Sequence, residues 1–244
     1  MQEGLASTIH AWLHNLSAIL IFSFFILPVA LILSLKWFNP PVSSYMLAFE
    51  LSGDKNPVHY QWKDWDEIAA SAPRAIITAK DQLFSKRAAI DFEQLKHAFD
   101  KFPQGSQIYG TSAITKQAVR NLFLWNDKSL FTRGLESWLT LLMETSLDKK
   151  RILEIYLNIV EFTPGIYGVE SASQRFFYKP AAKLTDNDAA LLAAVLSNPE
   201  QYQVNSNSVV VEDHQRWILD QMKALDLSTM LAENDDNVFH ASLF

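Results

Sequence analysis

The segment KKRILEIYLN, from Lys149 to Asn158, has the most regular pattern in this chain of 244 residues. Its apolar side chains continue past the segment at the three- and four-residue spacing of a helix face. The positions are Ile152, Tyr156, Ile159 and Val160. The spacing predicts a helix packed against a core. Glu154, Tyr156 and Asn158 are interpreted as scaffold residues rather than as chemical groups.

Helical spacing recurs on both sides of this segment. Pro73 is placed to begin a helix that runs toward Phe84, because proline suits the first helical turn. Thr111 or Ser112 is a candidate N-cap for the helix that follows. The apolar positions of the further predicted helices are Ile114, Ala118, Leu122 and Trp125, then Leu135, Trp138, Leu139 and Leu142, and later Leu184 through Leu196. Strand-like alternation is scarce, and Val209 to Val211 is the only short β-branched run. Pro199 and residues 205–208 are predicted loop. The body is therefore predicted to be mainly α.

An uncharged run of 20 residues, Leu16 to Leu35, precedes the body. As a helix it would span about 30 Å, the thickness of the hydrocarbon core of a bilayer. A cleaved signal peptide and a buried core helix are the alternatives. Residues 1–15 contain no Lys or Arg, which argues against a signal peptide. We predict a transmembrane anchor at 16–36. The helix is expected to break after it at Asn39, Pro40 and Pro41, because proline lacks the N–H that a helix needs. The predicted organisation is a tail (1–15), the anchor (16–36), a linker (37–72), a folded domain (73–225) and a C-terminal tail (226–244).

Composition excludes several classes of protein. The chain has no cysteine, which excludes disulfides, thiol catalysis and iron–sulfur clusters. The 7 glycines are about 3% of the chain, less than half the usual share of roughly 7%. Neither of the glycine-rich nucleotide-binding motifs, GxGxxG and GxxxxGK followed by Ser or Thr, occurs in the sequence. The 6 histidines show no metal-ligand spacing, and we predict no metal site. An apolar content of 49% excludes a disordered chain.

Charge is distributed unevenly along the chain. Residues 74–151 hold 13 basic and 8 acidic residues, whereas residues 152–244 hold 5 and 13. The basic middle could bind phosphate or anionic lipid, and solvated helix faces are the alternative explanation. Nucleic acid is the least favoured partner and we predict none, because the body follows the predicted anchor and has no recognised binding motif.

A series of ordered motifs begins at the end of this basic middle. The strongest is Lys149 to Asn158, and Asn39 to Met46 is a further one that lies before it. The motifs that follow it are Glu161-Phe162, Gly165, Tyr167-Gly168-Val169-Glu170, Gln174 to Pro180, Leu184-Thr185, Ala189 to Leu196 and Asn198-Pro199. In these motifs the chain resembles the family-51 peptidoglycan glycosyltransferases over about residues 37–225. It is most similar to the monofunctional, membrane-anchored biosynthetic transglycosylases.

The resemblance implies a helical, lysozyme-like fold of two lobes after one N-terminal transmembrane helix. It implies polymerisation of a lipid-linked disaccharide-peptide precursor into glycan strands. The body would lie on the outer, periplasmic face of the bacterial inner membrane. No cofactor is required, although the resemblance allows a divalent metal. Cell-wall assembly or division proteins are further partners that it suggests.

The first motif of the family departs from its pattern in this chain. The family has a catalytic glutamate in Glu-Asp-Gln, then Phe, His, Gly and Asp. This chain has Lys80-Asp81-Gln82, then Phe84, Arg87, Ala89 and Asp91. A lysine is normally protonated at pH 7 and cannot accept a proton. We therefore expect Lys80 to inactivate the general-base position, with Asp81 the first substitute to consider.

The pyrophosphate-binding motifs are partly retained. Gly-Gly-Ser-Thr-Ile-Thr-Gln-Gln is matched by Gly110 to Gln117, with Lys116 in place of the first glutamine and Arg120 at the lysine that follows. Arg-Lys-x-x-Glu becomes Thr132 to Glu136, which keeps the second acid, Glu136, and places Arg133 at the second cation. The residues predicted to bind substrate pyrophosphate are Lys116, Gln117, Arg120 and Arg133. For Glu136, an ion pair with Arg133 is the alternative to a role in the site.

Two functions stay open at this point. One is a peptidoglycan glycosyltransferase whose activity is weak or lost, because Lys80 replaces the catalytic Glu. The other is a non-catalytic relative that binds precursor or serves as a cell-wall assembly scaffold. Function depends on the site rather than on the fold.

Overall fold

The structure is a computed structural model that describes residue 12 and residues 22–53, 56–82, 84, 112–125, 127, 129–196 and 208–223. The chain forms two compact units, Met1–Phe38 and Asn39–Phe244.

In the first unit, a turn of π-helix, η1 (Phe22–Ile26), continues into α2 (Leu27–Ser34). Pro28 lies in the first turn of α2, where its missing N–H costs no intrahelical hydrogen bond. None of the helices among the described residues has the length and apolar character needed to cross a membrane. Residues 16–21 lie outside the described ranges, so the anchor at 16–36 stays a prediction.

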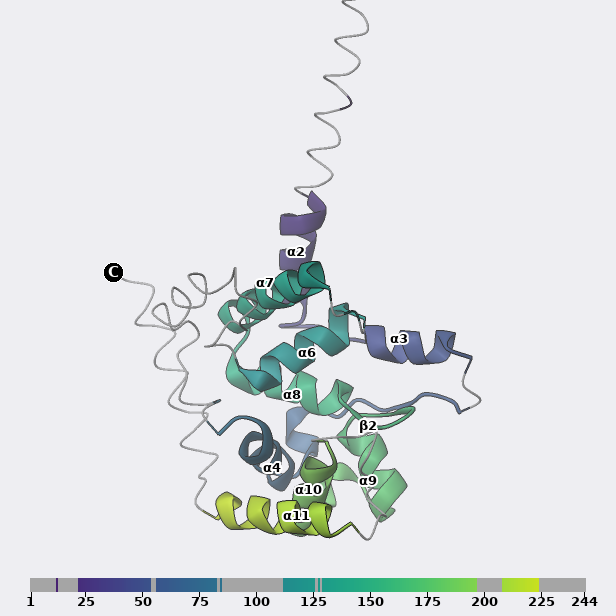
Figure 1. Cartoon of the computed structure of the whole chain (residues 1–244), viewed down its shortest axis with the longest axis vertical. Coiled ribbons are helices and arrows are strands. Elements are labelled where there is room, and N and C mark those ends of the chain that lie inside the picture. The colour runs from purple at the N-terminus through teal and green to yellow at the C-terminus, as the bar shows by residue number, and fades with distance from the viewer. Residues whose placement is uncertain are drawn as a thin grey trace, which may run out of the picture. The chain divides into compact units, whose positions relative to one another are not determined.

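The second unit is mainly helical, which confirms the predicted class. Its helices are α3 (Ser44–Leu51), α4 (Ser71–Lys80), α6 (Ala113–Phe123), α7 (Leu130–Ser146), α8 (Lys149–Ile159), α9 (Val169–Phe177), α10 (Asp186–Val195) and α11 (Val209–Met222), with short 3₁₀ turns η2 (Trp65–Glu67) and η4 (Ala181–Lys183). Helix α8 lies in the middle, with α6 on one side and α4 and α9 on the other (Figure 1). All residues from Ile152 to Val160 are buried, so α8 is the central helix of the core. An arrangement in two lobes stays a prediction.

Capping residues mark where several helices begin. Ser112 accepts hydrogen bonds from the backbone of Ile114 and Thr115, which confirms it as the N-cap of α6. The same role falls to Ser43, Ser129, Asp148 and Thr185 at the starts of α3, α7, α8 and α10. These side chains satisfy N–H groups that have no acceptor inside the helix.

The structure corrects three expectations from the sequence. Helix α4 begins at Ser71 and ends at Lys80, so the predicted run from Pro73 toward Phe84 is wrong at its C-terminal end. Asp81 leaves the helix with φ −162° and ψ 79°. Trp125 lies beyond the end of α6 and is exposed, not on its buried face. The β-branched run at Val209 forms the first turn of α11 rather than a strand.

The strands form one small sheet with the order β1 (His59–Tyr60), β3 (Ile166–Tyr167), β2 (Glu161–Thr163). β1 pairs with β3 in parallel, and β2 pairs with β3 antiparallel. Gly168 follows β3 with φ +81°, and a Cβ there would collide with the backbone oxygen of Asn158. Glycine therefore permits the close approach of this turn to α8.

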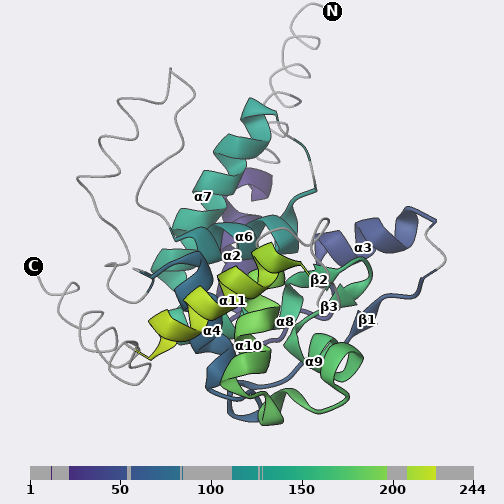
Figure 2. The same cartoon turned by 60° about the horizontal axis from the view of Figure 1, so that its bottom comes forward.

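Helices α4, α10 and α11 pack together at the end of the body away from α7 (Figures 1 and 2). This places position 80, on α4, in a different helix group from the cations of α6 and α7.

Candidate functional site

Lys80, at the expected general-base position, is the last residue of α4. Its Nζ donates a hydrogen bond to the backbone oxygen of Leu196, 2.8 Å away, at the C-terminus of α10. At the other ends of the two helices, Arg74 Nη2 donates to Asp186 Oδ1 at 2.8 Å, so α4 and α10 run in the same direction. Burial lowers the pKa of Lys80, whereas the negative end of the α10 dipole favours the ammonium form. Lys80 thus joins two helices.

Asp81, the suggested substitute base, binds the start of α6. Its Oδ2 accepts a hydrogen bond from the backbone N–H of Ala113 at 3.1 Å, and its side chain is buried. A second buried acid, Glu144 on α7, accepts from the backbone N–H of Ser112 at 2.9 Å. The two carboxylates therefore bind consecutive N–H groups at a helix N-terminus, where negative charge is favoured.

Glu144 was not predicted from the sequence. It lies on the buried face of α7 with Leu139 and Met143, and an acid on an apolar helix face was the signal available. Lys149 accompanies it, with Nζ 3.8 Å from Glu144 Oε1 and 4.9 Å from the ring centroid of Phe84. This buried charge pair packs the first motif against α7 and α8.

Arg120 and Glu136 form the ion pair that joins α6 to α7. Arg120 Nη2 donates to both carboxylate oxygens of Glu136, at 3.0 and 2.8 Å. The Glu136 side chain is 3% exposed, whereas that of Arg120 is 47% exposed. Within the described ranges no other acceptor binds this guanidinium, so Nη1 and Nε have no hydrogen-bond partner there. Glu136 is paired with Arg120 and not with Arg133.

The remaining predicted binding residues lie along the same two helices. Gln117 Oε1 accepts a hydrogen bond from the hydroxyl of Tyr156 at 2.9 Å, which connects α6 to α8. Burial raises the pKa of Tyr156, so its hydroxyl stays a donor. Lys116 is half-buried and Arg133 is exposed. No ion pair of either cation occurs among the described residues.

Thr132 stands where the resemblance places the first cation of the third motif. Its hydroxyl lies 2.8 Å from Asp127 Oδ2 and 2.9 Å from the hydroxyl of Ser129, the N-cap of α7. Thr132 is therefore part of the cap of α7 and adds no charge to the site.

The polar residues of α8 are structural. Glu154 accepts hydrogen bonds from the backbone N–H of Trp65 at 2.7 Å and from Arg151 Nη1 at 2.6 Å. Asn158 exchanges two hydrogen bonds with the backbone of Lys63, both 2.8 Å long. These contacts fix the segment before α4 on the central helix, in agreement with the scaffold interpretation.

Arg87, Ala89, Asp91, Gly110 and Thr111 lie outside the described residues. Within the described part of the chain, no group of three His, Cys, Asp or Glu side chains is placed to hold a metal ion. No described set of ligands therefore fits the divalent metal that the resemblance allows.

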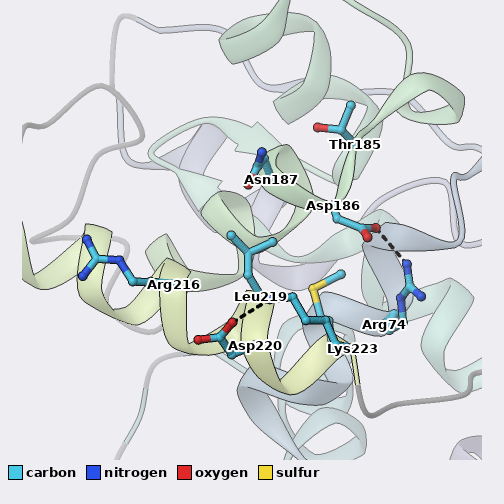
Figure 3. Close-up of a pocket in the computed structure, with 9 residues that line it drawn as sticks. Arg74, Thr185, Asp186, Asn187, Arg216, Leu219, Asp220 and Lys223 are labelled. Carbon is cyan, nitrogen blue, oxygen red and sulfur yellow. Dashed lines mark hydrogen bonds and ion pairs between the residues drawn. The ribbon is translucent and has the colours of Figure 1, made fainter.

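A hollow of about 620 Å³ lies elsewhere, between the first turns of α4 and α10 and the end of α11 (Figure 3). Leu219 and Met222 contribute apolar surface to it. Its charged side chains pair with neighbours: Arg74 with Asp186, Lys223 with Asp220, and Arg216 with Asp213. This balance of charge gives the hollow no preference for an anion. Arg74 precedes Lys80 by six residues, about 9 Å along a helix, so the hollow is separate from position 80.

Comparison with known proteins assigns the body of the chain to a family. The family model described as Transglycosylase matches residues 49–223. The chain is 41% identical over 216 residues to a biosynthetic peptidoglycan transglycosylase of Shewanella amazonensis, which covers 88% of each protein. A protein of the same name from Mannheimia succiniciproducens is 42% identical over 212 residues, which covers 84% of this chain and 87% of the relative. A third, from Aeromonas hydrophila, is 39% identical over 198 residues, 80% of this chain and 84% of the relative.

Proposed function

We propose, because the chain belongs to the transglycosylase family, that it binds the lipid-linked peptidoglycan precursor but polymerises it weakly or not at all. The observation that carries this proposal is the hydrogen bond from Lys80 to Leu196. A peptidoglycan glycosyltransferase needs a general base for the attacking sugar hydroxyl and cations for the departing pyrophosphate. The second requirement is better met in this chain than the first.

Two opposing effects act on Lys80 as a base. Burial lowers its pKa and moves the amine toward the neutral form, which could accept a proton. The hydrogen bond to Leu196 stabilises the ammonium and directs a proton of Nζ to the end of α10. General-base catalysis contributes about 10²–10⁴-fold, so a residual rate is compatible with the loss of the base.

Asp81 does not replace the missing glutamate in this arrangement. Its Oδ2 is engaged by the backbone of Ala113 and its side chain is buried. A base must reach the proton that it removes, at hydrogen-bond distance or through one water. Asp81 is therefore proposed to stabilise the start of α6.

The cations of α6 and α7 support precursor binding. Arg120 uses one nitrogen for Glu136 and keeps the others, on a half-exposed side chain. Arginine binds phosphate oxygens well because it offers several donors in one plane. Lys116 lies one turn before Arg120 on α6, and Arg133 lies one turn before Glu136 on α7. Because Arg120 pairs with Glu136, the three cations belong to neighbouring turns of the two helices.

We further propose that residues 16–36 anchor the body to the outer face of the cytoplasmic membrane. The uncharged run of 20 residues supports the anchor. Large apolar side chains are exposed on α3 and around the start of α7, namely Leu47, Leu51, Trp125, Leu130 and Phe131. Such side chains suit a lipid surface.

The decisive assay compares this protein with a relative that carries Glu at position 80. Both would receive lipid-linked precursor and divalent metal, and glycan polymer would be measured over time. We expect little or no polymer from this protein. A rate equal to that of the relative would disprove the proposed loss of activity.

Precursor binding is measured separately, at increasing salt. Binding should weaken with ionic strength, because contacts of exposed charges are screened. A variant with Lys116, Arg120 and Arg133 all replaced by Gln should lose most of the binding. Unchanged binding by this triple variant would make these cations irrelevant. For the anchor, a reporter fused after residue 50 should be active only outside the cytoplasm.

A further inference from the structure

Two buried acids of α7 contact α6 at separate points. Glu136 binds the side chain of Arg120, and Glu144 accepts a hydrogen bond from the backbone N–H of Ser112, the N-cap of α6, at 2.9 Å. The acids are eight residues apart and so are their partners, which corresponds to about 12 Å along each helix. Because the later acid meets the earlier partner, α6 and α7 run side by side in opposite directions (Figure 1).

The two contacts differ in what they hold. Arg120 reaches Glu136 with a long side chain that is 47% exposed, so this ion pair leaves the helix some freedom to shift. Glu144 is buried and binds the backbone at the start of α6 directly. A single contact would allow α6 to pivot on α7, whereas a second one at the other end of the helix prevents it. Glu144 therefore fixes the register of the two helices.

Glu144 is itself held in place by the central helix. Lys149, the first residue of α8, is buried and has its Nζ 3.8 Å from Glu144 Oε1. A buried charge is costly unless an opposite charge or a hydrogen bond compensates it, and Glu144 has both kinds of partner. Its carboxylate is thus a fixed point between α6, α7 and α8.

The register matters because the predicted binding cations lie on both helices. Lys116 and Arg120 are one turn apart on α6, so the helix itself sets their spacing. Arg133 lies on α7, and its distance from the other two depends on how α6 is placed against α7. A single phosphate group can bind the cations of α6 alone. A pyrophosphate, with two phosphate groups, can bind cations of both helices.

We propose that Glu144 is a positioning residue, which sets the register of α6 on α7 so that Arg133 shares one pyrophosphate with Lys116 and Arg120. This inference rests on the proposed precursor binding and assigns to that site a residue that touches no ligand. Glu144 acts through the backbone of Ser112. Its acceptor oxygen is therefore what the site requires, whereas its charge serves the pairing with Lys149.

The test measures binding of inorganic pyrophosphate and of inorganic phosphate to the full chain in detergent micelles by titration calorimetry. Glu144→Met removes the acceptor and should lower pyrophosphate affinity about 10-fold, the effect of one lost charge-assisted contact. Phosphate affinity should stay within about 2-fold, because α6 keeps its own two cations. Glu144→Gln should keep the pyrophosphate affinity, since its amide oxygen can still accept from Ser112. Melting temperatures should fall in both variants, because both lose the pairing with Lys149.

Glu170→Met is the matched control. Glu170 is also buried and accepts a backbone hydrogen bond, from Ala181 at 2.7 Å, but it joins α9 to η4. Its loss should lower the melting temperature and leave pyrophosphate affinity unchanged. Glu144→Asp keeps the charge on a shorter side chain and should also weaken pyrophosphate binding, which provides the test if Glu144→Met does not fold.

Four results would overturn the role of Glu144 while leaving the binding site in place. They are an unchanged pyrophosphate affinity in both Glu144→Met and Glu144→Asp, an equal loss of phosphate and pyrophosphate affinity, an affinity in Glu144→Gln as low as in Glu144→Met, and an equal loss in Glu170→Met. Absence of pyrophosphate binding by the unmodified protein would instead overturn the proposed binding site, and this inference with it.

Discussion

Lys80 Nζ lies 2.8 Å from the backbone oxygen of Leu196. The residue at the expected base position is thus the last of α4, and its side chain caps the C-terminus of α10. The substitution of Lys for Glu thus has a structural consequence as well as a chemical one. A carboxylate at position 80 would meet a carbonyl oxygen at the negative end of a helix, which is unfavourable.

Lys80→Glu should therefore destabilise this protein by about 1–3 kcal/mol, since a donor is lost and two acceptors are brought together. Urea unfolding would measure the change. Lys80→Gln should cost less, because its amide can still donate to Leu196. Lys183, an exposed lysine of η4, provides the control, and Lys183→Glu should change the stability by less than about 0.5 kcal/mol. Equal stabilities of Lys80→Glu and the unmodified protein would contradict the capping role.

Polymerising activity should return only in part when Glu is restored at position 80 alone. Arg87 and Thr132 still differ from the family, and roughly 1 Å of misplacement can cost about 100-fold. We expect Lys80→Glu with Arg87→His and Thr132→Arg to polymerise precursor faster than the single variant. The triple variant with Gln at position 80 is the control without a carboxylate. A single variant as active as the triple would show that position 80 was the whole defect.

Arg120 and Glu136 should be energetically coupled. A double-mutant cycle with Arg120→Met and Glu136→Gln should give a coupling of about 1–3 kcal/mol, below the value for a fully buried pair because Arg120 is half-exposed. The exposed pair Arg216 and Asp213, 3.3 Å apart, is the control, and its coupling should be close to zero. A coupling near zero for Arg120 and Glu136 would mean that the pair does not join α6 to α7.

His214 should make stability depend on pH below neutrality. Burial lowers the pKa of His214 from 6.5, and the positive charge of Lys80 lowers it further. The folded state thus binds fewer protons than the unfolded state at acidic pH, so stability falls as the pH drops below 6.5. His214→Gln should reduce this slope between pH 7 and 5.

The part due to Lys80 can be separated by NMR titration of His214. In Lys80→Met the pKa of His214 should rise, although burial would keep it below 6.5. The His214→Gln spectrum identifies the resonance among the 6 histidines. An unchanged pKa in Lys80→Met would contradict the proximity of α4 to α11 at this point.

Local patterns predicted much of the helical body. Thr111 or Ser112 was predicted as an N-cap, because Ser, Thr and Asp side chains satisfy the free N–H groups of a first helical turn, and the structure places Ser112 there. The spacing of Ile152 and Tyr156 predicted the face of α8 but not that the helix is buried all round. The end of α4 was missed, because Asp81 leaves the helix in order to bind Ala113, a residue distant in sequence.

The helical class and the family motifs, with a lysine at position 80 where the resemblance expects a glutamate, could be read from the chain alone, because they depend on residue types and short spacings. The partners of the charged residues emerged from the three-dimensional packing: Arg120 for Glu136, Leu196 for Lys80, and Ser112 for Glu144. The physical reason is that a buried charge or donor must find a partner in three dimensions. The nearest suitable group came from another helix in each case, at a separation that no local pattern encodes.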